Sequence, residues 1–179
     1  MTDRARTLAQ ALDLSGPLLT RYLAGFDDDN RTTQAPGLPN HAAWTLGHCA
    51  VAMHRLANRL TGSETFPERH FAPTDDPDHP GQDTGRFAVA SVVFGSTPID
   101  RPALYPRLAP ATDAFDAARA RLVEIVLTLS DHDLDTSLPW HSSSMTAADL
   151  IARITFHNGT HAGQLTDLRR ALALGPITL

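Results

Sequence analysis

Hydrophobic side chains recur at helical spacing in four stretches of the chain. They fall three or four residues apart over residues 3–26, over 40–60, from 106 or 112 to 130, and over 147–174. This spacing places them along one face of an α-helix. No clear alternation of apolar and polar positions indicates β-strands. The pattern therefore predicts an all-α fold, a bundle of four amphipathic helices.

Residues that favour helix ends bound these stretches. Asn40 is suited to be the N-cap of the second helix, and Gly62 follows its end. Thr146 and Asp149 have the spacing of a capping box at the start of the fourth helix. Within the first helix, Pro17 is expected to kink or restart the helix, because proline lacks a backbone N–H.

The second connection is long and rich in helix breakers. Residues 62–102 contain six prolines and four glycines, so most of this segment is expected to be irregular. Its apolar piece, residues 87–94, fits helical turns or a short strand, and we favour helical turns. We expect a single domain, residues 1–179, with this irregular insertion at about 62–102 covering the opening of a functional site.

Composition excludes several classes of function. The chain has 179 residues, a formal charge of −5 and fifteen basic residues, all of them arginine, so lysine chemistry and a basic nucleic-acid surface are not expected. Its single cysteine excludes an intrachain disulfide and favours a cytoplasmic location. No apolar run is long enough for a membrane span or signal peptide. Nine histidines are the unusual feature.

Two histidines interrupt the leucine stripe of the fourth helix. His157 and His161 are four residues apart, so their rings lie on one face, one turn apart, and can bind the same ion. The spacing alone is weak support, because histidine pairs arise by chance in a chain with this many histidines. A buried histidine pair with hydrogen bonds and no metal remains an alternative.

The second helix adds a third histidine to the same interior. His48 lies on a stripe that also carries His41 and Trp44. Three imidazoles leave coordination positions open for water or a substrate, as in reactive metal sites. The expected cofactor is one divalent transition metal ion: zinc, nickel, iron, cobalt or manganese. We expect His41 and Trp44 to line the cavity. His141, which precedes the fourth helix, is a further candidate for the cavity, with a solvated loop position as the favoured alternative.

Other catalytic arrangements fit these residues poorly. A thermolysin-like metalloprotease requires glutamate after the first histidine of its motif, but Asn158 follows His157. Neither a G-x-S-x-G motif nor the strands of a serine hydrolase occur. Cys49 points away from His48 around the helix and is expected to be a buried thiol. The remaining histidines are expected at the surface or in loops: His54, His70, His79 and His132.

Two segments together resemble the DinB-like (DinB/YfiT-like) superfamily. They are residues 40–48, NHAAWTLGH, and 157–165, HNGTHAGQL, with Leu168, Arg169 and Arg170 shortly after. The resemblance implies an up-down-down-up four-helix bundle with a long second connection, often dimeric. It also implies one divalent metal ion bound by His48, His157 and His161.

The same resemblance suggests the chemistry. Characterised relatives include mycothiol-dependent maleylpyruvate isomerase and transferases that use bacillithiol. We therefore expect a metal-dependent enzyme, a homodimer, that activates a low-molecular-weight thiol or water for transfer, isomerisation or hydrolysis of a small molecule. Arginine, Arg55 or Arg86, would recognise anionic groups. The alternative is a non-catalytic metal-binding or stress-response bundle. No nucleic-acid or membrane partner is expected.

Overall fold

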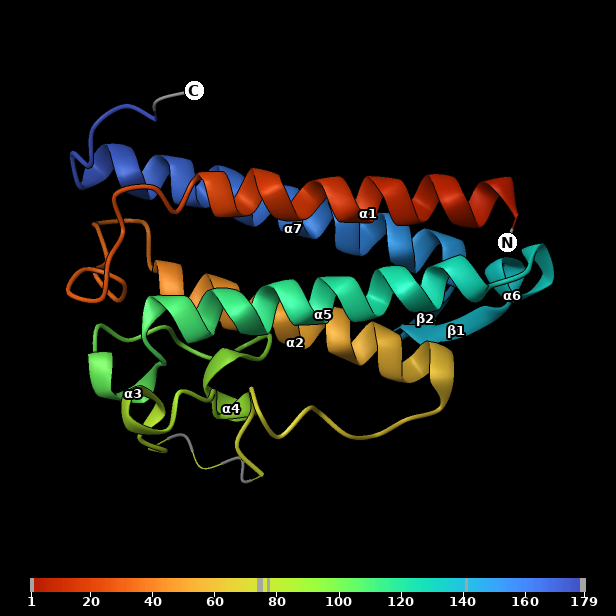
Figure 1. Ribbon diagram of the computed structural model, residues 1–179, viewed down its shortest axis with the longest axis horizontal. Helices are drawn as coiled ribbons and strands as arrows, with labels where there is room; N and C mark the ends of the chain where they lie inside the picture. The colour runs from red at the N-terminus through yellow and green to blue at the C-terminus, as the bar shows by residue number, and fades with distance from the viewer. Residues whose placement is uncertain (1, 74–75, 77, 141, 178–179) are drawn as a thin grey trace.

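Four long helices run side by side through the structure (Figure 1). The structure is a computed structural model, and it describes residues 2–73, 76, 78–140 and 142–177. The long helices are α1 (Asp3–Arg21), α2 (Ala42–Thr61), α5 (Leu108–Thr128) and α7 (Ala147–Ala171). Both α1 and α2 pack against α5 and α7. The prediction of a mostly helical chain is confirmed.

The apolar stripes of the long helices meet in a shared core. In α1 the buried positions include Ala5, Ala9, Leu12 and Leu19, which follow the helical period. The core also contains Leu122 of α5 and residues such as Leu150 and Leu165 of α7. None of the described helices combines the length and the apolarity that a membrane span needs.

The first helix is shorter than predicted but continues through its proline. It ends at Arg21 instead of residue 26, and Pro17 lies inside it without ending it. Gly25 has a positive φ of 87°, which a helix cannot accommodate. Leu23 and Phe26 are nevertheless buried, because the turn after the helix keeps the same apolar face toward the core.

The caps of α2 and α7 are close to those predicted. The N-cap of α2 is His41 instead of Asn40, and its Nδ1 accepts a hydrogen bond from the Trp44 backbone N–H at 3.1 Å. Gly62 ends α2 in the left-handed conformation. At the start of α7, the Thr146 side chain accepts from the Asp149 N–H, so Thr146 is the N-cap and this half of the predicted capping box is present.

The connection between α2 and α5 covers one side of α2. It is mostly irregular and contains the short helices α3 (Gly81–Thr84), α4 (Val89–Val92) and η1 (Pro102–Leu104). Helix α4 confirms the preference for helical turns over a strand within residues 87–94. Phe71, Phe87 and Val92 are buried, and α4 packs on α2. Most of α2 is therefore buried on more than one face.

The linker before α7 contains structure that the sequence analysis did not predict. It comprises α6 (Asp131–Asp135) and an antiparallel hairpin of β1 (Ser137–Trp140) and β2 (Ser143–Thr146). Arg4 of α1 bonds to Asp135 at 2.8 Å and ties the linker to the first turn of α1. The strands have four residues each and are exposed or half-buried, and only β1 alternates between the two, so the pattern was too short to indicate a hairpin.

Two of the histidines expected at the surface or in loops are in fact buried. His54 lies inside the protein, where its Nδ1 accepts from Arg121, which also donates to Asn58 at 2.8 Å. His70 is buried and contacts the Asp113 carboxylate at 2.8 Å. The expectation was wrong because it assumed that α2 buries one face only, whereas the long connection also covers a second side of this helix. Burial, with the nearby charge of Arg121, lowers the pKa of His54 to about 4.

His54 should make the stability of the protein depend on pH. Its pKa is about 4 when folded and about 6.5 when unfolded, so the unfolded chain takes up the proton first as the pH falls. Stability present above pH 6.5 is therefore lost as the pH falls toward 4. Between pH 7.5 and 5.0, the free energy of unfolding should fall by about 2 kcal/mol more in the wild type than in His54→Gln.

Urea unfolding with a chelator present measures this difference. Glutamine preserves an acceptor for Arg121 but does not titrate, so the comparison isolates the proton on His54. His132→Gln, at an exposed position of α6, should behave as the wild type. Equal losses of stability in the wild type and His54→Gln would contradict the prediction.

Candidate metal centre

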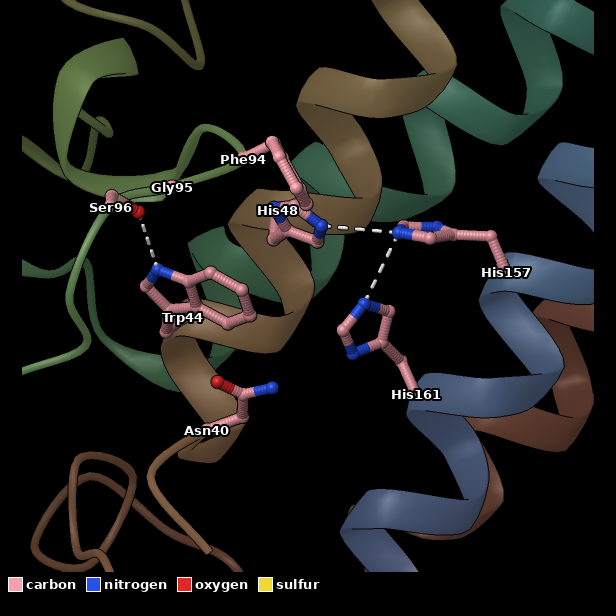
Figure 2. A pocket seen from close by; sticks show the side chains of 8 residues that line it. All are labelled: Asn40, Trp44, His48, Phe94, Gly95, Ser96, His157 and His161. Carbon is pink, nitrogen blue, oxygen red and sulfur yellow. Dashed lines mark hydrogen bonds between the residues drawn. The ribbon is translucent and has the colours of Figure 1, made fainter.

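Three imidazoles from two helices converge at one point. His48 extends from α2, and His157 and His161 extend from α7 (Figure 2). The Nε2 of His157 lies 3.1 Å from the Nε2 of His48 and 3.2 Å from that of His161. Their available ligand atoms all lie within 4.8 Å of one another. These three histidines could hold a metal ion.

The spacing of the nitrogens suits a small divalent cation. Zinc binds imidazole nitrogen at about 2.0–2.1 Å with tetrahedral geometry, which separates two ligating nitrogens by about 3.4 Å. The two Nε2–Nε2 separations at His157, 3.1 and 3.2 Å, are close to that value. Without a cation, one proton on His157 would have to serve both neighbouring imidazoles. The donor set therefore fits a metal ion better than it fits hydrogen bonding alone.

The orientation of His48 is fixed by two contacts. Its ring stacks on the indole of Trp44, with ring centres 4.4 Å apart and planes 9° apart. Its Nδ1 lies 2.8 Å from the carbonyl oxygen of Val92. Because a carbonyl can only accept, Nδ1 carries the proton and Nε2 directs its lone pair toward His157. Such a partner on the second ring nitrogen is the usual support for a metal-binding histidine.

All three imidazoles are kept neutral by their surroundings. Burial lowers the pKa of His48, lowers that of His157 to about 4 and lowers that of His161 to about 3. In His157 and His161, the charge of a neighbouring imidazole is the next largest cause. Because a metal binds the deprotonated imidazole, the site is in its ligating form at neutral pH.

A pocket of about 310 Å³ opens onto the three histidines. On one side lie Asn40 and Trp44, and on another lie Phe94, Gly95 and Ser96 of the long connection (Figure 2). The Trp44 indole N–H donates to the Ser96 hydroxyl at 3.0 Å, which joins the two sides. The insertion thus contributes part of the pocket wall.

The other predicted cavity residues have different positions. Trp44 lines the pocket, whereas His41 is fully buried, with its ring edge-on to Tyr105 at 4.5 Å. His41 is not among the described residues that line the pocket. His141 lies outside the described residues.

Two residues next to the histidines, Asn158 and Cys49, do not line the pocket. Asn158, which follows His157, donates to the Ser15 hydroxyl of α1 at 3.1 Å and so belongs to helix packing. Cys49 is buried, as predicted, and burial raises the pKa of its thiol.

Several residues that shape the centre were not identified from the sequence. Val92 acts through its backbone carbonyl, which any residue type could provide, so no sequence signal was available. Ser96 and Phe94 belong to the irregular connection, whose path the hydrophobic pattern does not specify. Gly47 was detectable as a small residue beside His48: a Cβ there would lie 2.6 Å from Phe87 and 2.9 Å from Val92.

Comparisons with known proteins extend over nearly the whole chain. The sequence model described as DinB superfamily matches residues 11–165. A solved structure, "Crystal structure of the conserved protein of locus from Enterococcus faecalis", aligns with a TM-score of 0.72 at 16% sequence identity. That alignment covers 97% of this chain and 99% of the other, and it concerns the fold. No curated protein matches the sequence significantly.

Proposed function

The chain belongs to the DinB superfamily, and from this premise we propose that it is a metal-dependent enzyme that activates a low-molecular-weight thiol. His48, His157 and His161 would bind one divalent transition metal ion. The observation that carries the proposal is the convergence of three neutral imidazole nitrogens within 4.8 Å at the base of a pocket. Three protein ligands leave room for a fourth from a small molecule.

The arrangement of the long helices agrees with this proposal. In Figure 1, α2 and α5 run in one direction, and α1 and α7 run in the other. We propose that they constitute the up-down-down-up four-helix bundle expected for the family, in a single domain. In that bundle the metal lies between α2 and α7, which places its ligands on rigid elements.

Each neighbouring residue has a definable role. A divalent ion bound here would lower the pKa of a thiol that joins it, and so supply a nucleophile at neutral pH. Val92 holds the proton on Nδ1 of His48 and leaves Nε2 free for the ion. Trp44, stacked on His48 and bonded to Ser96, keeps that ring in place and shields it from water.

Thiol activation fits the lining better than water activation does. Among the described residues, no aspartate or glutamate lines the pocket, so no carboxylate is available there as a general base. A free thiol has a pKa of about 8.5, against about 15.7 for water, so far less stabilisation of the anion is needed. Water activation is thus the second candidate, and a non-catalytic metal-binding bundle is the third.

Metal content is the first test. Protein purified without an affinity tag and reconstituted with divalent zinc, nickel, cobalt, iron or manganese should retain about one equivalent of one of these ions after dialysis. Elemental analysis measures this directly. Retention below about 0.2 equivalents of every ion would refute the three-histidine site.

Activity of the metal-loaded protein then separates the three candidates. Thiol activation predicts that added 2-mercaptoethanol is transferred to 1-chloro-2,4-dinitrobenzene, with a carbon–sulfur bond formed and chloride released, faster than without protein. Hydrolysis of 4-nitrophenyl acetate without thiol transfer would support water activation. A metal-loaded protein that accelerates neither reaction would favour the non-catalytic bundle.

A further inference from the structure

A second pocket adjoins the one at the three histidines. It has a volume of about 270 Å³ and is lined by residues of α2, α7 and β1. His48, His157 and Phe94 line both pockets. The two pockets therefore meet at the candidate metal centre. We call the second one the arginine lobe, after Arg55, Arg59 and Arg153, which line it together with Trp140.

The three guanidinium groups surround the lobe from two helices. Arg55 and Arg59 lie one turn apart on α2, and Arg153 lies one turn before His157 on α7. The guanidinium carbons of Arg59 and Arg153 lie 5.3 and 5.4 Å from the centre of the Trp140 ring. Two of the three guanidinium groups thus lie against the same indole ring.

No carboxylate of the described residues balances this charge. Within the described part of the chain, no aspartate or glutamate lines the lobe, and none forms an ion pair with its three arginines.

We propose that the arginine lobe binds the carboxylate of a small acidic compound that reacts at the three histidines, an acidic thiol being the simplest case. This inference rests on the proposed function and specifies its substrate class. Guanidinium groups match the two oxygens of a carboxylate, and three of them line the lobe with no carboxylate of the described residues beside them. Arg153 and His157 lie one turn apart on α7, about 6 Å along the helix axis, and both line the lobe, so one small molecule can contact both.

A pair of matched thiols tests the proposal. Protein loaded with Co²⁺ is titrated with 3-mercaptopropionate and with 3-mercapto-1-propanol, and thiolate coordination is followed by the sulfur-to-cobalt charge-transfer absorption. We expect the acidic thiol to bind at least tenfold more tightly than the neutral one. Equal affinities of the two thiols would overturn the proposal.

Variants locate the selectivity. Arg59→Gln combined with Arg153→Gln should weaken binding of the acidic thiol at least tenfold and leave the neutral thiol unchanged. Arg55→Gln should cause part of the loss, and it does not disturb Arg59, which also donates to the Pro139 carbonyl of the hairpin. Arg21→Gln, at an exposed position outside both pockets, is the control. Equal weakening of both thiols would show a structural role and overturn the proposal.

A separate measurement tests carboxylate binding by the arginine lobe without metal or thiol. Calorimetric titration of the metal-free protein with succinate should show binding that the double variant loses and Arg21→Gln retains. If succinate binds in this way but neither thiol coordinates Co²⁺, the carboxylate site stands and the proposed thiol activation fails. Absence of succinate binding at millimolar concentration would overturn the proposal that the arginine lobe binds carboxylates.

Discussion

Replacing His161 by alanine is expected to abolish stoichiometric binding of the divalent ion. The variant loses one of three nitrogens that converge around His157, and two imidazoles hold an ion far less tightly than three. Loss of a supporting residue alone typically reduces metal affinity about 10–100-fold, so loss of a ligand should exceed about 100-fold. His157→Ala should have the same effect, measured as metal content after reconstitution and dialysis.

The same variants should lose stabilisation by the metal. An ion present at about 1,000 times its Kd adds about 4 kcal/mol to the free energy of unfolding of the wild type. His157→Ala and His161→Ala should unfold at the same urea concentration with and without the ion, whereas the exposed His132→Ala should respond as the wild type does. Unfolding in chelator verifies that each variant is folded. Stoichiometric binding in either alanine variant would exclude that histidine as a ligand.

The three histidines could be found from the sequence because they stand where leucine is expected. His157 and His161 interrupt an apolar stripe, and His48 lies on a second one, so their side chains had to face the same interior. The helical period fixes the direction in which each side chain projects from its helix, and the structure places the three imidazoles together. The four long helices were predictable for the same reason, with ends that differ from the predicted ones by a few residues.

The hydrophobic pattern was less informative where contacts come from outside the helix. His54 was assigned to the surface because it lies off the stripe of α2, yet the long connection buries it. The hairpin of β1 and β2 escaped detection because its strands are short and largely exposed. In both cases the deciding interactions are between segments far apart in the chain, which local periodicity does not record.

The sequence contains a signal for the arginine lobe in the spacing of arginines from the histidines. Arg55 was predicted to recognise an anion, whereas Arg59 and Arg153 were not. All three lie at helical spacing from the histidines: Arg55 and Arg59 follow His48 by seven and eleven residues, and Arg153 precedes His157 by four. Residues at these spacings share a helix face, so extending the stripes beyond the histidines would have identified the lobe. Arg86, the other candidate, is not among the described residues that line either pocket.

Replacing Gly47 by alanine is expected to weaken metal binding without touching a ligand. An added Cβ would lie 2.6 Å from a ring carbon of Phe87 and 2.9 Å from a methyl carbon of Val92, both buried. The segment carrying Val92 must then move away from α2, and its carbonyl would lose the bond to Nδ1 of His48. We expect metal affinity to fall about 10–100-fold and the metal-free protein to lose about 1–3 kcal/mol of stability.

Gly163→Ala provides the matched control for this prediction. Gly163 is also helical, two residues after His161, but an added Cβ there meets no atom within 4 Å. Alanine favours a helix over glycine by about 1 kcal/mol, so this variant should be as stable as the wild type or more so, with unchanged metal affinity. The helix preference acts equally at Gly47, so the difference in stability between the two variants measures the clash with the connection. If Gly47→Ala matched Gly163→Ala in both urea unfolding and metal competition, the close approach of Val92 would have no part in holding His48.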